Sequence, residues 1–177
     1  MRILLHTCCG PCASACVPRL EKEGHSVALL FSNSNIDTFD EFERRRAAAE
    51  KLAAAENVEI AVGEYRHEEW LKEVAAGLEN EPEKGERCRR CYRYNIAMAA
   101  RYAAGHGFDA VTTSLTVSPH KPSALVFEAG RDAAGRMFAE FDFKKRGGFA
   151  ESTRRARELG LYRQSYCGCE FSKREER

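Results

Sequence analysis

The sequence predicts an α/β fold of one domain, in which a doubly wound, mainly parallel sheet carries helices on both faces. Short apolar runs alternate with longer segments of helical composition along the chain, which is typical of parallel α/β proteins. One of them, residues 27–31, is continuously apolar, as expected of a parallel strand covered on both faces. No linker, internal repeat or low-complexity tract interrupts the 177 residues, so we expect a single domain over residues 1–177.

The first half of the chain contains three predicted pairs of a strand and a helix. Gly24 is a suitable C-cap for the first helix, which follows a short apolar strand. The run VALLF is a continuously apolar strand, and the helix after it is rich in Ala, Glu and Arg. Gly77 weakens the end of the third helix. The predicted strands are residues 3–6, 27–31 and 58–62, and the predicted helices run to about Glu23 and over residues 40–55 and 64–78.

The second half of the chain begins with a loop that contains Pro82 and Gly85 and has no apolar periodicity. The β-branched residues Val111, Thr112 and Thr113 favour a strand after the next helix. A turn at residues 118–122 precedes a further helix. The predicted strands are residues 110–115 and 137–143, and the predicted helices are residues 88–104, from the turn to about Ala134, and 151–159.

Composition and charge indicate a soluble globular protein. The chain is 44% hydrophobic and 31% charged, with a net charge of only +1. No apolar run approaches the roughly 20 residues needed to cross a bilayer. The N-terminal MRILLHTCCG has too short an apolar stretch for a secretory signal. We therefore expect a cytoplasmic protein without a membrane partner, in which reduced thiols rather than a structural disulfide framework are the rule.

Eight cysteines gather into three groups that lie far apart in the sequence. A cysteine used only for packing is an isolated small hydrophobe, whereas metal binding and disulfide exchange need two or more sulfurs close together. The sequence therefore indicates a metal and redox site to which the fold brings all three groups. The groups are Cys8-Cys9-x-x-Cys12 with Cys16 close behind, Cys88-x-x-Cys91, and Cys167-x-Cys169.

The predicted fold gives the first two groups a suitable place. Ligands of open parallel sheets bind at the carboxyl ends of the strands, where turns lead into helices. The turn from Thr7 to Cys12 leaves the first strand at such an end, with Gly10 allowing close approach and Pro11 suited to a first helical turn. Helix N-termini stabilise anions, so thiolates at both helix starts are favoured.

Five sequence blocks resemble those of the non-cobalamin epoxyqueuosine reductase family. They are LLHTCCGPCAS, ENEPEKGERCRRCY, TTSLTVSPHK, FDFKKRGGFAES and LYRQSYCGCEFS, in the family's order from Leu4 to Ser172. The resemblance implies an adenine-nucleotide hydrolase-like, Rossmann-like fold. It also implies an oxidoreductase that reduces epoxyqueuosine at the wobble position of tRNA to queuosine, the last step of that modification.

The same resemblance implies roles for individual cysteines. Cys167 and Cys169 are expected to be a redox-active pair, which can form a disulfide. Cys12 fits the opening motif and is an additional candidate metal residue, as is Asp37, which stands where the resemblance implies a His in many relatives. Cys16 matches nothing in the motif and is expected to be buried. The residues implied as ligands of a 4Fe-4S cluster are Cys8, Cys9, Cys88 and Cys91.

The chemistry of these groups supports such a division of labour. If only three thiolates bind the cluster, the fourth iron is free to act as a Lewis acid, and a second iron ion is a further possibility. A dithiol stores the two electrons that removal of an epoxide oxygen requires, and an external electron donor must restore it. His120 is the preferred general acid. Asp142 is a candidate ligand, proton relay or ion-pair partner, with ion pairing the default.

Basic residues near the cysteines are the candidates for binding tRNA. Such side chains can hold phosphates, and a modified wobble base can be taken out of a single-stranded anticodon loop. Solvated helix surface is the alternative that charge alone favours. The candidates are Arg89, Arg90, Lys144, Lys145 and Arg163.

Two other functions remain open from the residues. In a zinc-binding structural or tRNA-binding protein, Cys8 and Cys9 would join Cys88 and Cys91 in a closed four-sulfur site, which leaves the last cysteine pair without a role. A nucleotide-dependent tRNA thiolase shares the α/β scaffold. It needs a Ser/Gly-rich pyrophosphate loop after the first strand, and the turn here contains a single glycine.

Overall fold

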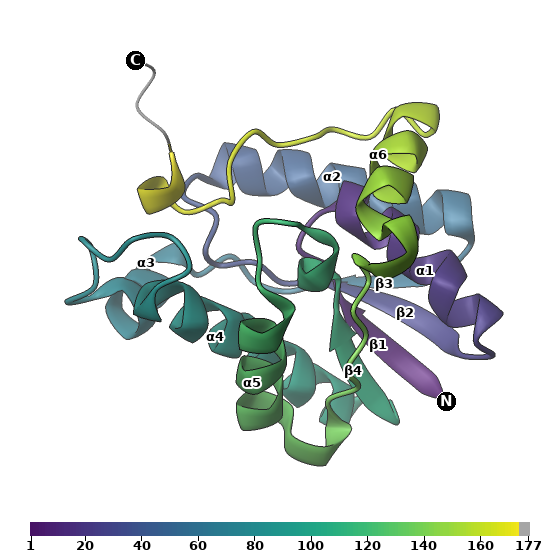
Figure 1. Cartoon of the computed structure of the whole chain (residues 1–177), viewed down its shortest axis with the longest axis horizontal. Coiled ribbons are helices and arrows are strands. Elements are labelled where there is room, and N and C mark those ends of the chain that lie inside the picture. The colour runs from purple at the N-terminus through teal and green to yellow at the C-terminus, as the bar shows by residue number, and fades with distance from the viewer. Residues whose placement is uncertain (174–177) are drawn as a thin grey trace.

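The computed structural model describes residues 1–173, in which four parallel strands form one sheet in the order β3-β2-β1-β4 (Figure 1). Leu4 in β1 lies opposite Ala28 in β2 on one side and Val111 in β4 on the other. All pairs in this register run parallel, which confirms the predicted type of sheet. The strands are β1 (Arg2–His6), β2 (Ser26–Phe31), β3 (Glu59–Val62) and β4 (Ala110–Thr113).

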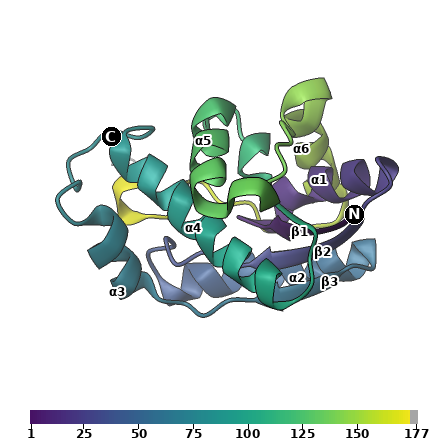
Figure 2. The ribbon, with the colours of Figure 1, turned by 90° about the horizontal axis from the view of Figure 1, so that it is seen from below.

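Helices cover both faces of the sheet, as predicted (Figure 2). Ile3 and Leu5 of β1 point to one face, where they pack with α1, α2 and α6. Leu4 points to the other face and packs with Ala99 and Ala103 of α4, which in turn contacts α5. The helices are α1 (Gly10–Lys22), α2 (Phe39–Glu56), α4 (Glu86–Gly105), α5 (Ser123–Ala134) and α6 (Gly148–Glu158).

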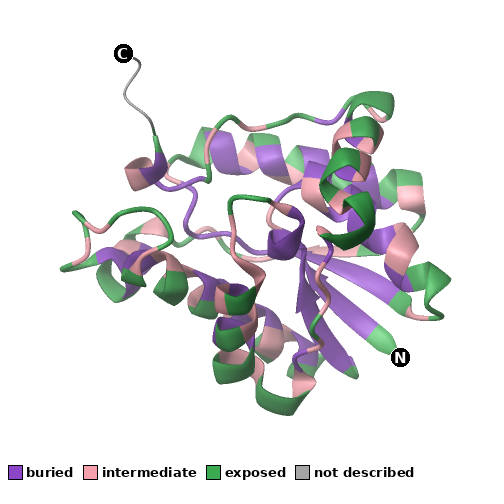
Figure 3. Ribbon diagram, in the orientation of Figure 1, coloured by how far each residue is buried: buried purple, intermediate pink, exposed green. Residues whose placement is uncertain are grey.

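Burial follows this layering (Figure 3). The two central strands, β1 and β2, are buried after their first residue, and β4 is buried throughout. The edge strand β3 is only half-buried. Continuous apolar runs therefore mark the strands with two neighbours and two covered faces, which is why they were readable in the sequence.

The strand order creates a switch point beside β1. The chain leaves β1 toward β2 on one side, while β4 lies on the other, so the connections after β1 and β4 diverge. In open α/β sheets this is the place where ligands bind, outside the carboxyl ends of the strands. The turn after β1, which carries Cys8 and Cys9, and the segment after β4, which begins at Ser114, face each other there.

The predicted strand at residues 137–143 is wrong. Within the described residues this segment makes one isolated parallel bridge, Phe138 with Val111, and one ladder-like hydrogen bond, from the Ala139 amide to the Val111 carbonyl. The strand β4 ends at Thr113, which lies opposite residue 140 in this register, so no strand backbone remains for residues 141–143 to pair with. The hydroxyl of Thr116 bonds the Phe141 carbonyl at 2.8 Å and the Phe143 amide at 3.2 Å instead.

Two other predicted elements are shorter than expected. Residues 114 and 115 belong to a 3₁₀ turn, Ser114–Val117, and not to the strand before it. The predicted helix at residues 64–78 is reduced to α3 (His67–Trp70) and a π-helical turn, Leu71–Ala75. Trp70 is fully buried on the inner face of this piece. No helix within residues 1–173 has the length and apolar character of a membrane span.

Candidate metal and redox centre

The turn after β1 brings three sulfurs together. The sulfurs of Cys8, Cys9 and Cys12 all lie within 4.8 Å of one another, and those of Cys8 and Cys9 are 4.0 Å apart. Cys9 is the N-cap of α1, and its sulfur accepts a hydrogen bond from the Cys12 amide at 3.4 Å. A thiolate at this position therefore accepts a hydrogen bond from a free amide of the first helical turn and is stabilised by the positive end of the helix dipole.

Gly10 lets this turn approach α2. A β-carbon at residue 10 would lie 2.6 Å from the carbonyl oxygen of Ala48, a distance that atoms in contact do not reach. The close approach fixes the start of α1, and with it the direction of the cysteines on either side of Gly10. The glycine in the motif is thus required by packing and not by the chemistry of the site.

Proton sharing among these thiols favours one thiolate. Hydrogen bonds from the thiols of Cys12 and Cys8 hold the pKa of Cys9 well below the ordinary value. The hydrogen bond with the Cys12 thiol lowers the pKa of Cys8. The hydrogen bond to Cys9 and burial raise it, and their combined effect is larger, so that the pKa of Cys8 is raised to about 11. Hydrogen bonds to Cys8 and Cys9 raise the pKa of Cys12. This donor set fits a soft metal, which would replace the shared protons.

The second cysteine pair lies in the first turns of α4. The sulfur of Cys88 accepts a hydrogen bond from the Lys84 amide at 3.3 Å, and that of Cys91 accepts one from the Asn95 side chain at 3.6 Å. Burial raises the pKa of Cys91 well above its usual value, and the charges of Cys167, Cys169 and Cys88 raise it further. The α4 pair and the C-terminal pair are therefore electrostatic neighbours, although about 80 residues separate them.

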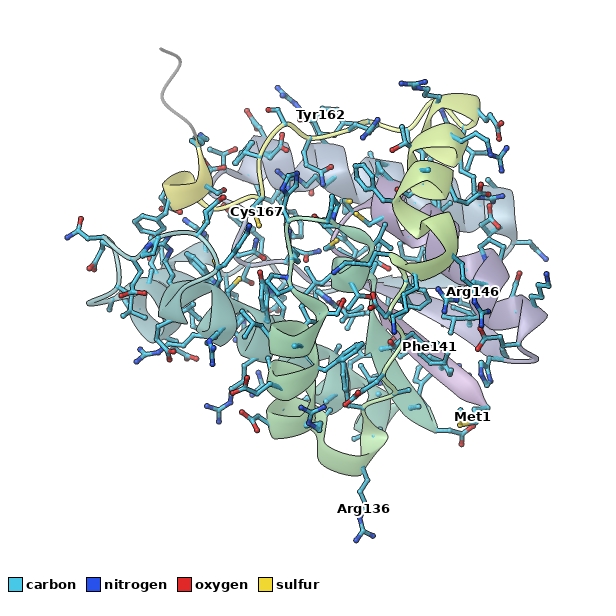
Figure 4. All side chains as sticks on the ribbon, viewed as in Figure 1. Met1, Arg136, Phe141, Arg146, Tyr162 and Cys167 are labelled. Carbon is cyan, nitrogen blue, oxygen red and sulfur yellow. The ribbon has the colours of Figure 1, made fainter. Side chains whose placement is uncertain are left out.

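The third pair lies on the segment after α6 (Figure 4). Cys167 is exposed, whereas Cys169 is buried against Trp70 and Cys91. Gly168 between them has a φ of +142°, in the range that favours glycine. Both cysteines are free thiols in this structure. The pair thus presents one accessible and one protected sulfur.

Lys121 stands between the cysteine groups and had no role in the sequence-based prediction. Burial by itself lowers the pKa of its ammonium, but the nearby thiolates of Cys167 and Cys8 raise that pKa well above the ordinary range. The half-buried ammonium of Lys121 therefore lies within electrostatic range of both the first and the third cysteine group. Its place directly after His120 in the turn was the only signal in the sequence, and a lysine in a loop is too common to be read as a site.

Each of the four cysteines expected to bind a cluster receives a hydrogen bond. Two donors are the amides described above, from Cys12 to Cys9 and from Lys84 to Cys88. The others are side chains: the buried Ser114 hydroxyl donates to the sulfur of Cys8 at 3.3 Å, and Asn95 donates to Cys91. Hydrogen bonds to ligand sulfurs orient them and tune the metal. Ser114 was missed because 106 residues separate it from Cys8. Asn95 is four residues after Cys91 on the same helix, and this i,i+4 spacing is the signal that could have found it.

The candidate acids His120 and Asp142 and the candidate ligand Asp37 differ in their exposure and in their hydrogen-bond partners. His120 is exposed, and its amide donates to the Ser118 hydroxyl. Asp142 accepts a hydrogen bond from Ser123 at 2.9 Å and lies in the irregular segment after Phe138, not at a strand end. Asp37 is bound on both carboxylate oxygens, by the Tyr166 hydroxyl at 2.6 Å and by Lys173 at 2.5 Å.

The predicted tRNA-binding residues are partly engaged within the protein. Arg89 pairs with Glu128 and Arg90 with Glu86, each at 3.4 Å and on exposed surface. Lys144 donates to the Lys121 carbonyl and to Ser123. Lys145 and Arg163 are exposed. Cys16 is fully buried in α1, as predicted.

The fold and the cysteine groups define a class of protein. It is a doubly wound α/β protein whose switch point carries thiols suited to a metal and to redox chemistry, and not a phosphate-binding loop. The chain belongs to the epoxyqueuosine reductase QueH family of oxidoreductases, because the profile of that family, described as "Epoxyqueuosine reductase QueH", matches residues 3–175. This membership confirms the family resemblance and supports a reductase over a nucleotide-dependent thiolase.

Similar proteins span nearly the whole chain. A protein of Streptococcus pyogenes serotype M1 is 35% identical over 96% of this chain and 69% of its own length. One of Dehalococcoides mccartyi is 34% identical over 98% of this chain and 93% of its own, and one of Thermotoga maritima is 32% identical over 99% and 92%. Each of the three is named epoxyqueuosine reductase QueH.

Proposed function

We propose that this protein reduces epoxyqueuosine at the wobble position of tRNA to queuosine. The observation that carries the proposal is the close group of Cys8, Cys9 and Cys12 at the switch point of a chain that belongs to this reductase family. Cys88 packs against the same core cluster as Cys8, and Cys91 packs beside Cys169. Neither a packing role nor a nucleotide site needs such an arrangement. A cytoplasmic location and an external electron donor are parts of the same proposal.

In this proposal, Cys8, Cys9, Cys88 and Cys91 hold a 4Fe-4S cluster. Such a cluster supplies single electrons, at a potential set by hydrogen bonds and burial around its sulfurs. The chain provides both: Ser114, Asn95 and two backbone amides donate to the four sulfurs, and Cys9 is buried while the other three cysteines are half-buried. The three close sulfurs of the first turn leave Cys12 available for a second iron ion. Asp37 could join it only by releasing Tyr166 or Lys173.

Cys167 and Cys169 supply the two-electron chemistry in this proposal. As the dithiol closes to a disulfide, it releases two electrons and two protons. Both carbon–oxygen bonds of the epoxide break, a carbon–carbon double bond forms, and the oxygen leaves as water with those protons. An external reductant then opens the disulfide again. Exposed Cys167 is accessible to that reductant, whereas buried Cys169 is protected from it.

Proton transfer and tRNA binding involve the rim of the site. His120 is exposed beside Lys121 and is our candidate general acid, while Asp142, bound to Ser123, is better suited to order this loop. Lys145 and Arg163 are free of ion pairs among the described residues and are exposed, so they suit phosphate contacts. Arg89, Arg90 and Lys144 would exchange internal partners for phosphate.

A structural zinc site is the second candidate, favoured by one observation. The sulfurs of Cys8, Cys9 and Cys12 lie within 4.8 Å of one another, a spacing that suits a single ion without further movement. Such a site would explain the first cysteine group but leave Cys167 and Cys169 without a function.

The test is reduction of tRNA that contains epoxyqueuosine by protein purified and assayed without oxygen. We expect the modified nucleoside to lose one oxygen atom, as read by mass spectrometry after digestion of the tRNA. Cys167→Ala and Cys169→Ala should keep their iron and lose turnover, whereas Cys88→Ala and Cys91→Ala should lose both. A wild-type protein with its full iron content that leaves epoxyqueuosine unchanged, with dithionite as reductant, would refute the proposed function.

A further inference from the structure

The segment that carries Cys167 and Cys169 is fastened along α2. After α6 it crosses over α2 and ends beside α3 (Figure 1). Lys51 of α2 donates to the Gly160 carbonyl at 3.1 Å, and the Tyr162 hydroxyl donates to Glu41 at 2.9 Å. These contacts fix the beginning of the segment, and a stronger set fixes the part next to the two cysteines.

Arg45 of α2 is buried at that point, with 2% of its surface exposed. Its guanidinium donates to the carbonyl of Cys167 at 2.8 Å and to the carbonyl of Tyr166 at 3.3 Å. Its Nε atom donates to the carboxylate of Glu41 at 2.7 Å, and the group lies over the ring of Tyr166. Burial of a charged pair costs free energy unless such hydrogen bonds satisfy it, so these contacts are tightly defined.

Three successive carbonyls of the segment are held in this way. Those of Tyr166 and Cys167 accept from Arg45, and that of Gly168 accepts from the Asp37 amide at 2.9 Å. The peptide groups on both sides of Cys167 are therefore fixed, and so is the direction of its side chain. A β-carbon at Gly168 would lie 3.2 Å from Arg45, so a larger residue there would disturb the same contact.

We propose that Arg45 is the positioning residue of the Cys167-Gly168-Cys169 pair, holding its backbone in the form in which the dithiol closes to a disulfide. The redox role of the pair rests on the function proposed above, but the positioning role is a separate claim. A fixed backbone loses less conformational freedom on ring closure, which raises the effective concentration of one thiol at the other. The disulfide is thereby stabilised, so the reduction potential of the pair is lowered.

The test measures the potential of the pair against glutathione, without oxygen and at about pH 6, below the usual thiol pKa, so that the charge of Arg45 has little influence on the thiols. Closure of the disulfide transfers two electrons and two protons to oxidised glutathione, which becomes two molecules of the reduced form. The disulfide fraction is read by mass spectrometry on the peptide that contains Cys167 and Cys169. Arg45→Gln should shift the equilibrium constant about tenfold toward the dithiol, equal to about 30 mV for a two-electron couple.

The controls separate position from overall stability. Arg46→Gln, at a half-buried neighbour that pairs with Glu43 and does not contact the C-terminal segment in the described residues, should leave the potential unchanged. The double variant Glu41→Gln with Arg45→Met removes both buried charges, a change that folded proteins often tolerate, and should show the same tenfold shift. An unchanged potential in a folded Arg45 variant overturns the positioning role alone. A wild-type pair that forms no disulfide at any glutathione ratio overturns the dithiol mechanism and, with it, this inference.

Discussion

Hydrogen bonds to sulfur are the main residue-scale feature of the site. The Ser114 hydroxyl accepts the Cys8 amide at 3.0 Å and donates to the sulfur of the same residue at 3.3 Å. One side chain thus fixes both the backbone and the thiol of Cys8, at the point where β4 ends. In metal sites such outer partners hold a ligand in its binding orientation before the metal arrives.

We predict that Ser114→Ala weakens metal binding by about 10- to 100-fold, because Cys8 loses its orienting partner. The unpaired Cys8 amide should also lower the free energy of unfolding of the metal-free protein by about 1–3 kcal/mol. Metal affinity is measured by competition with a chelator, and stability by urea unfolding. Ser152→Ala, at a buried serine of α6 that bonds the Phe149 carbonyl, is the matched control and should keep wild-type affinity. Equal affinities of the two variants would exclude the orienting role.

Sequence alone predicted the cysteines and not their partners, for a physical reason. Cysteine groups are recognisable because each brings two or more sulfurs together locally, whereas Ser114 and Cys8 are 106 residues apart and meet only through strand pairing. Arg45 likewise looked like one of several charged residues of an exposed helix. Its burial depends on the C-terminal segment, which covers it.

Close packing of α1 against α2 is the element-scale feature that positions the first cysteine group. The contact at Gly10 leaves no space for a side chain, since the obstructing atoms are the backbone of Ala48. A backbone cannot rotate away as a flexible side chain can. The two helices would therefore have to separate, and the turn with Cys8 and Cys9 would move with α1.

Gly10→Ala should accordingly lower the free energy of unfolding by about 1–3 kcal/mol, the usual cost of overpacking. Urea unfolding of the metal-free protein is the measurement. Gly105→Ala at the end of α4, where a β-carbon meets nothing within 4 Å, is the control and should be neutral or stabilising. If both variants unfold at the wild-type midpoint, the approach of α1 to α2 is not tight in solution.

The strands that were predicted correctly differ from the wrongly predicted strand at residues 137–143 in the partners of their backbone hydrogen bonds. Strands β1, β2 and β4 are apolar runs that pair with a neighbour along most of their length. Residues 137–143 are also rich in apolar side chains, although Glu140 and Asp142 interrupt them, but Phe141 and Phe143 turn their backbone to the Thr116 side chain. Composition reports burial of a segment, and it does not report whether a partner strand is present beside it.

At the scale of the whole molecule, the site joins three parts of the chain that the sheet alone does not connect. The turn after β1, the start of α4 and the segment after α6 meet around Lys121 and the cysteines. Without metal, the thiols at this site and the half-buried ammonium of Lys121 must satisfy one another. A metal bound to thiols from two or more of these parts would therefore stabilise the folded chain as a whole.

We therefore predict that removal of the metal group lowers the thermal unfolding midpoint. At a free concentration of about 100 times Kd, binding contributes about 2.7 kcal/mol, which corresponds to about 5–10 °C for a chain of this size. Unfolding is followed by circular dichroism before and after chelation without oxygen. The variant Cys88→Ala with Cys91→Ala should unfold at the chelated wild-type midpoint in both conditions. A wild-type midpoint that chelation leaves unchanged would show that the group does not link these segments.

The fold class and the edge of the sheet that carries the site were predictable from this sequence. Continuous apolar runs indicate a parallel sheet, and a parallel sheet implies a site at its carboxyl edge. The cysteine groups were expected to converge, but the path that brings the C-terminal pair to the α4 pair was not predictable. The segment after α6 has no regular structure before Glu170, and its path depends on Arg45 and Asp37. The position of this segment is determined by hydrogen bonds to residues of other elements, and local composition does not reveal such contacts.

The most direct test of the account is the iron, acid-labile sulfide and zinc content of the protein purified without oxygen. If Cys8, Cys9, Cys88 and Cys91 hold a 4Fe-4S cluster, the protein should contain about four irons and four sulfides per chain and a brown absorption that bleaches on reduction. One zinc per chain with no sulfide would contradict the account, since it would make the cysteine group a structural site.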